Sequence, residues 1–150
     1  NTFANEFLFQ DTVDADFFIN ILAPWWDDLD MAPLGGAAYY QTTGTAPNRV
    51  FTLEWQKAKI AVPAGSDDFF SFQIKLYEGS NIVEFHYIHG DNADGSNTDT
   101  TASVGIKDEV GGDGHVIDGW SGETSGFTAT NYQRRAADFP ADGSIIVFTP

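Results

Sequence analysis

The sequence contains no cysteine, which excludes disulfides, thiolate zinc sites and cysteine nucleophiles. Basic residues are also scarce: seven Lys plus Arg face 22 Asp plus Glu, so the formal net charge is −15 at pH 7. A chain with this charge repels nucleic-acid phosphates and anionic membrane surfaces. No apolar run approaches the roughly 20 residues of a membrane-spanning helix. We therefore expect neither nucleic-acid binding nor membrane insertion.

No signal-peptide pattern occurs in these residues, and the chain starts at Asn1 rather than Met. Hydrophobic residues make up 42% of the chain and aromatic residues 15%, which is too rich for disorder. The length of 150 residues is that of one domain. We expect residues 1–150 to form a single module that is a fragment of a longer protein.

Alternating apolar and polar residues predict β-strands along most of the chain. In Val50–Lys57, the side chains of Phe51, Leu53 and Trp55 share one face, as in a half-buried antiparallel strand. Two more alternating runs flank the turn Glu78–Asn81 and predict a hairpin. The other expected strands, including these two, are 6–10, 17–22, 37–43, 70–77, 82–88, 102–107, 115–119 and 144–149.

Helical patterns are almost missing, since only residues 135–138 allow a single turn. About nine short strands separated by turns are typical of all-β sandwiches and jelly rolls. The sequence therefore predicts an all-β fold, namely an antiparallel two-sheet β-sandwich of jelly-roll type with little or no helix.

One segment, Ile21–Leu29, combines an apolar run with a proline, two tryptophans and two aspartates. Pro24 has no amide hydrogen and a fixed φ angle, so it predicts the end of a strand. Neighbouring side chains on extended backbone point to opposite faces. We therefore expect one of Trp25 and Trp26 to enter the core and the other to meet solvent, a loop or a ligand.

Three carboxylates, those of Asp27, Asp28 and Asp30, follow the tryptophans. Carboxylate oxygens beside an indole suit a Ca²⁺ site, or a sugar site that combines ring stacking with hydrogen bonds to hydroxyls. The alternative is that these aspartates bind loop amides and fix a turn. Both interpretations stay open.

A second acidic segment, residues 91–99, also resembles a Ca²⁺-binding loop. Its spacing does not match that of an EF-hand, so a solvated loop is the alternative. Together the two segments give the candidate metal ligands Asp27, Asp28, Asp30, Asp91, Asp94 and Asp99.

Aromatic residues in exposed positions are candidates for stacking on a sugar ring. Trp120 lies in the Gly-rich segment Asp118–Gly122, and with Tyr132 and either Tyr39 or Tyr40 of the expected strand 37–43 it is a candidate for an aromatic sugar platform. The alternative for each ring is core packing. The candidate ligand-binding residues are Trp26, Trp120, Tyr40, Asp27 and Asp28.

Catalytic patterns are weak. Glu54 and Glu84 lie on the outward faces of their strands, but a chain so rich in acids brings some pair together by chance. A nucleophile elbow of the form G-x-S-x-G does not occur. We therefore expect a protein that is not an enzyme.

Several ordered sequence blocks resemble those of a module found in large secreted bacterial proteins. Residues 23–29 read APWWDDL, against APFWDDL in that module, and residues 39–49 read YYQTTGTAPNR in both. Further blocks are FQIKLYE at 72–78, IVEFHY at 82–87, SVGI at 103–106 and FTP at 148–150. The module is similar to the nidogen-like extracellular domain, a non-catalytic β-rich unit.

This resemblance implies a secreted or cell-surface location and transfers no catalytic residue. Members of the family usually carry further strands ahead of this segment, and a missing strand would leave a sheet edge that a partner strand can extend. Two functions stay open. One is a binding or adhesion module for polysaccharide, with Ca²⁺ as candidate ion. The other is a structural or assembly module that contacts a surface protein, a neighbouring chain or a neighbouring domain by strand addition.

Overall fold

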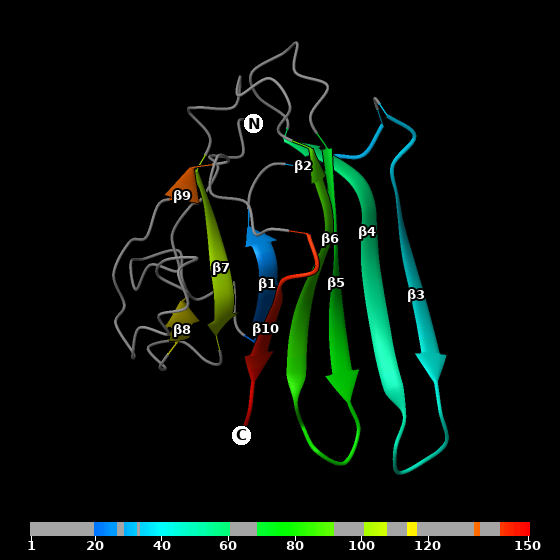
Figure 1. Ribbon diagram of the computed structural model, residues 1–150. Helices are drawn as coiled ribbons and strands as arrows, with labels where there is room; N and C mark the ends of the chain where they lie inside the picture. Colours follow the sequence, from blue (N-terminus) through cyan, green and yellow to red (C-terminus); the bar gives the residue numbers. More distant parts are fainter. Residues whose placement is uncertain are drawn as a thin grey trace. The chain divides into compact units, whose positions relative to one another are not determined.

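The computed structural model describes ten β-strands, in two antiparallel sheets, and no helix in the described residues (Figure 1). The residues described are 20–26, 29–32, 34–60, 69–91, 101–107, 114–116, 134–135 and 142–150. The predicted all-β class with two antiparallel sheets is confirmed. Within the same residues there is no helix of the length and apolarity needed to cross a membrane. The chain divides into two compact units, residues 1–28 with 97–138 and residues 29–96 with 139–150.

The sheet of the first unit is built around β7, which pairs with three other strands. Its members are β1 (Ile21–Trp26), β7 (Thr101–Lys107), β8 (Gly114–Val116) and β9 (Arg134–Arg135). Strand β8 begins one residue before the expected strand 115–119, of which residues 117–119 lie outside the described residues. Arg135 lies in a strand rather than in the helical turn allowed for it.

The expected strand end at Pro24 is wrong, because β1 continues through Pro24 to Trp26. Ala23 pairs with Gly105 and Trp26 with Ser103, so two residues of β1 oppose one residue of β7. Such a bulge tolerates proline, since the extra residue is left out of the hydrogen-bonded ladder. Trp25 is buried and Trp26 is half-buried, as expected for neighbouring side chains of which one enters the core.

The second unit contains a six-stranded sheet in the order β10-β6-β5-β4, with β2 and β3 both paired to β4. Its strands are β2 (Leu29–Asp30), β3 (Ala37–Thr43), β4 (Val50–Ile60), β5 (Phe69–Tyr77), β6 (Val83–Asp91) and β10 (Ile145–Phe148). The strand predicted at 37–43 and the hairpin around Glu78–Asn81 are confirmed. Strands β2 and β9 were not predicted, because a strand of two residues is too short to show the alternation of apolar and polar residues.

One face of this sheet, the core face, carries aligned apolar rows. Trp55 pairs with Phe72 and Phe72 with Tyr87, and the rings of Trp55 and Phe72 stack with their centroids 5.0 Å apart. Phe85 is fully buried and meets Phe148 edge-on at 5.0 Å. Burying each large side chain contributes about 2–3 kcal/mol, so these rows stabilise the sheet.

A bulge in β4 keeps its far end in register with the core. Lys57 adopts a left-handed φ of 53° and donates its amide hydrogen to Ser71 Oγ at 3.1 Å. The extra residue returns Ala58 to the core face, where it is fully buried. Gly36 passes so close that a Cβ there would lie 2.5 Å from the Lys57 carbonyl oxygen. Only glycine permits this approach.

Two turns lie against each other at one end of the sheet. Arg49 donates to both carboxylate oxygens of Glu78, at 2.6 and 2.8 Å, and the Glu78 amide donates to the Arg49 carbonyl oxygen at 2.9 Å. These hydrogen bonds lower the pKa of the Glu78 carboxyl to about 2. Gly79, with φ of 86°, fits beneath the Pro47 carbonyl. The blocks YYQTTGTAPNR and FQIKLYE thus meet in this turn pair.

Candidate functional site

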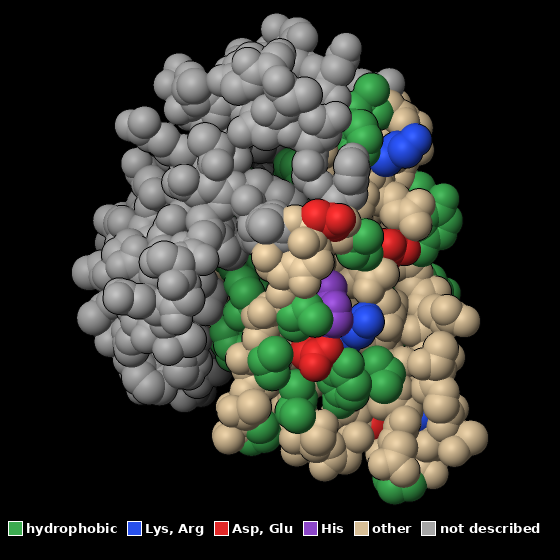
Figure 2. All heavy atoms as spheres, viewed as in Figure 1, with side chains coloured by type: hydrophobic (Ala, Val, Ile, Leu, Met, Phe, Trp, Pro, Cys, Tyr) green, Lys and Arg blue, Asp and Glu red, His purple; other side chains and the backbone are tan. Residues whose placement is uncertain are grey.

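The second face of the six-stranded sheet, here the outer face, carries mostly polar side chains. Figure 2 looks onto this face and shows acidic, basic, histidine and apolar side chains interspersed. Period-two alternation in each strand and the register between strands define its members. They include Tyr39, Gln41, Thr52, Glu54, Gln56, Gln73, Lys75, Tyr77, Glu84, His86, Ile145 and Val147.

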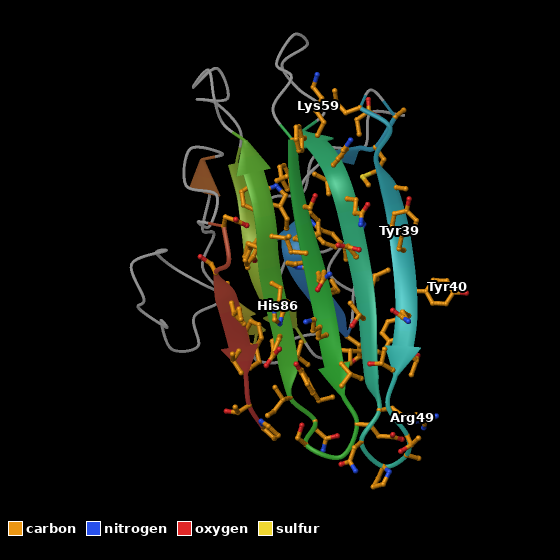
Figure 3. All side chains as sticks on the ribbon, turned by 45° about the vertical axis from the view of Figure 1, so that its right-hand side comes forward. Tyr39, Tyr40, Arg49, Lys59 and His86 are labelled. Carbon is orange, nitrogen blue, oxygen red and sulfur yellow. The ribbon has the colours of Figure 1, made fainter. Side chains whose placement is uncertain are left out.

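One row crosses five strands of the outer face. By register it consists of Tyr39, Glu54, Gln73, His86 and Ile145, and we call it the tyrosine row. Figure 3 labels Tyr39 on β3 and His86 on β6. Four strand spacings of about 4.8 Å give the row a length of about 19 Å. Tyr39 and Ile145 are each 53% exposed, so an accessible ring and an accessible aliphatic side chain flank the polar members.

Glu54 is held in place by its neighbours on the outer face. Gln73 Nε2 donates to one carboxylate oxygen at 3.1 Å, and Gln56 Nε2 donates to the other at 3.0 Å. A carboxylate accepts about four hydrogen bonds, so both oxygens keep capacity for a ligand. The arrangement therefore presents an oriented acceptor beside an exposed aromatic ring.

Glu84, in the adjacent row, receives two hydrogen bonds on a single oxygen. Tyr77 Oη and His86 Nε2 each donate to Glu84 Oε2 at 2.7 Å. Partial burial raises the pKa of the Glu84 carboxyl, but these hydrogen bonds and the charges of His86 and Lys75 outweigh it, so the pKa lies below its ordinary value. The hydrogen bond that Tyr77 Oη donates to Glu84 raises the pKa of the Tyr77 hydroxyl. The network fixes the His86 ring within the tyrosine row.

The β3 strand forms one edge of the sheet. Among the strands that the structure describes, β3 pairs with β4 alone. Tyr40 lies on the core-face side of β3, opposite Leu53, yet it is 79% exposed. Figure 3 shows its ring pointing away from the sheet, past the edge. Its ring lies beside that of Phe51, with the ring centroids 6.3 Å apart.

Comparison with known families supplies the next observation: a family model described as NIDO related matches residues 2–150. The chain belongs to the nidogen-related family. Searches of curated proteins and of solved structures gave no match. Membership confirms the resemblance carried by the sequence blocks, and it indicates that this nidogen-related chain is an extracellular module.

The structure describes only some of the predicted site residues of this nidogen-related module. Tyr40 is exposed rather than packed in the core, so the packing alternative is wrong for this residue. Trp26 is half-buried in β1, which belongs to the other unit. The predicted ligand-binding residues that lie outside the described residues are Trp120, Asp27 and Asp28.

The predicted metal ligands are described even less completely. Asp30 Oδ1 accepts a hydrogen bond from the Ala32 amide at 2.9 Å, which is the turn-fixing role given as the alternative. Asp91 ends β6, and only its backbone is described. The described part of the chain contains no group of three His, Cys, Asp or Glu that could hold a metal ion. The remaining predicted ligands, which lie outside the described residues, are Asp27, Asp28, Asp94 and Asp99.

The tyrosine row of the nidogen-related module was not predicted as a site, although Tyr39 was named with Tyr40 as a candidate sugar-stacking ring. The sequence contained part of the information needed to predict this row, because the alternation of residues already placed Glu54 and Glu84 on the outward faces of their strands. The tight turn between β5 and β6 also sets the pairing of Gln73 with His86. The pairing of β3 with β4, which brings Tyr39 beside Glu54, depends on the six-residue turn between them and could not be counted from the period alone.

Proposed function

We propose that this nidogen-related chain is a non-catalytic extracellular module that binds polysaccharide on the outer face of its six-stranded sheet. The observation that carries the proposal is the tyrosine row. An exposed ring, an oriented carboxylate, an amide and an imidazole follow one another across the strands. Aromatic rings stack on the apolar faces of sugars, while carboxylates and amides bind their hydroxyls.

The arrangement of the acidic residues favours binding over hydrolysis. Glu54 and Glu84 share the outer face, but β5 lies between their strands and they are offset by two residues in register. Two strand spacings, before the register offset is added, already place the backbones of these two residues about 10 Å apart, at the upper end of the roughly 5–9.5 Å between the carboxyl groups of glycosidases. Each carboxylate also has a local role, holding glutamine amides or the Tyr77 and His86 side chains.

The charge of the module narrows the class of polysaccharide. A formal charge of −15 disfavours sulfated or uronic-acid polymers, so the ligand is a neutral or amino-sugar polymer. Ca²⁺ is proposed as an accessory ion for the acidic segments at 27–30 and 91–99, since carboxylates are its preferred ligands.

The proposal is tested by screening the module on a glycan array, in buffer containing Ca²⁺ and in buffer containing EDTA. We expect binding to neutral or amino-sugar chains that falls at least tenfold in Tyr39→Ala. Tyr40→Ala, which removes an exposed tyrosine on the opposite face of β3, is the matched control and should bind as the wild type does. Binding that is insensitive to Tyr39→Ala, or no binding to any glycan, would refute the proposal. Loss in EDTA alone would support the accessory ion.

A further inference from the structure

We infer that β3 is a docking edge, at which a basic, extended segment of another polypeptide adds to the six-stranded sheet as a further strand. The inference goes beyond polysaccharide binding, because it uses the backbone of β3 and the ring of Tyr40 rather than the tyrosine row. Its starting point is the position of β3 at the sheet edge (Figure 1).

Most residues of β3 are accessible to solvent. Six of its seven residues are exposed. In an antiparallel pair, the amide and carbonyl of every second residue point away from the partner strand. The outward groups of Ala37–Thr43 therefore form a row of donors and acceptors with the spacing of a β-ladder. Another β-strand is the ligand whose chemistry matches this row.

The strand also lacks the features by which natural proteins protect sheet edges. Those features are lysines and other charges, prolines, bulges and short length. The sequence of β3 is AAYYQTT, without a charge, a proline or a glycine. Its register with β4 runs without interruption from Ala37–Gln56 to Thr43–Val50. Among the described strands, the other edge is β10, which has only four residues, so the two edges are not equivalent.

The side chains of β3 favour different residues on the two faces of an added strand. Tyr40 rests against Phe51 at the margin of the core face and stays 79% exposed. An apolar side chain of an added strand would cover this ring and continue the core face by one strand. On the outer face, Tyr39 and Gln41 would lie beside polar side chains. The matching segment therefore alternates apolar and polar residues.

Charge identifies the occupant as a basic segment of a different polypeptide. The chain carries a formal −15, so it attracts lysine-rich segments. A second copy of this chain would bring the same negative charge and be repelled. Pairing of two β3 edges in a homodimer is therefore an alternative outcome of the test rather than the inference.

The test uses a peptide of alternating Val and Lys residues, as long as β3, as the probe. A peptide of alternating Pro and Lys residues has the same charge but cannot form a strand, so it is the control for unspecific attraction. We expect the Val/Lys peptide to slow amide hydrogen exchange in β3 at least tenfold and the Pro/Lys peptide to leave it unchanged. Tyr40→Ala should weaken binding of the Val/Lys peptide about tenfold.

Two neighbouring proline variants sharpen the test. Of Gln41→Pro and Thr42→Pro, one removes an amide that faces β4 and the other an amide that faces outward. The variant that keeps the wild-type melting temperature identifies the outward amide, and it should lose peptide binding. Equal protection by both peptides, or undiminished binding in that variant, would overturn the inference. Self-association of the wild type that the same variant abolishes would overturn it in favour of a homodimer.

Discussion

The two faces of the six-stranded sheet have the same strands and opposite chemistry. The core face packs rings against each other, and Phe72, Phe85 and Tyr87 have at most 1% of their surface exposed. The outer face instead carries carboxylates, amides and an imidazole joined by hydrogen bonds of 2.7–3.1 Å. The stability of the core face depends on how well its side chains fill the available volume. The structure of the outer face depends instead on which side chains form hydrogen bonds with each other.

This difference separates stability from recognition in the module. Removing a buried ring leaves a cavity that the sheet cannot close, so the fold is strongly destabilised. Removing an outer-face side chain leaves groups that water can hydrogen-bond, so the fold persists while the surface changes. Ligand specificity can therefore vary on the outer face without loss of the core.

The largest expected effect is on the core face. Phe72→Ala should lower the free energy of unfolding by about 3–5 kcal/mol, because it deletes the ring that lies between Trp55 and Tyr87. Its neighbour in sequence, Gln73, lies on the outer face, and Gln73→Ala should change stability by about 1 kcal/mol or less. Urea unfolding of both variants measures the contrast. Similar losses in the two variants would mean that the faces are not distinct.

The next effect concerns the bulge that keeps β4 aligned with the core face. Gly36→Ala would place a Cβ 2.5 Å from the Lys57 carbonyl oxygen and 2.8 Å from that of Gln56. Relieving this contact requires the backbone to shift, at a cost of about 1–3 kcal/mol. Gly35→Ala is the comparison, since its Cβ would meet no atom within 4 Å and only its φ of 66° opposes the change. Thermal unfolding should rank Gly36→Ala as the less stable variant, and the reverse ranking would contradict the close approach.

Most of the core face was predictable from the sequence, and the reason is its period of two. Phe51, Leu53 and Trp55 alternate with polar residues, so their shared face follows from strand geometry. The bulges in β1 and β4 were not predictable. They depend on tertiary contacts, such as the hydrogen bond from the Lys57 amide to Ser71, which local alternation does not encode. For the same reason, the proline in β1 was misread as a strand end.

The outer face was less predictable, because it depends on the register between strands. Alternation places Glu54 and His86 outward but does not show that Gln73 lies between them. For Tyr40 the sequence left open both an exposed ring and a core ring, because the edge position of β3, which decides between them, is a property of the whole sheet. Sequence thus indicates which face a side chain occupies, and topology decides its neighbours.

The smallest expected effect lies on the outer face, where one oxygen of Glu84 joins Tyr77 and His86. Glu84→Gln should cost only about 1 kcal/mol at neutral pH, because water replaces the lost partners. The pKa of Glu84 lies below its ordinary 4.5, so its contribution is present above pH 4.5 and is lost as pH falls through the lower, folded-state pKa. The pKa of Tyr77 lies above its ordinary 10.0, so the contribution of its hydroxyl is present below pH 10 and is lost as pH rises through the raised pKa.

These two limits define a pH window in which the wild type exceeds the Glu84→Gln variant in stability. Urea unfolding of both proteins across the pH range should show that the wild type is more stable than the variant within the window, and that this difference in stability is lost at both ends. An absorbance titration should show a lower Tyr77 pKa in the variant. Glu54→Gln is the matched control, since Glu54 accepts hydrogen bonds from glutamine amides. It should leave the Tyr77 titration unchanged. If Glu84→Gln also left that titration unchanged, the outer face would lack the fixed hydrogen-bond pairing that distinguishes it from the core face.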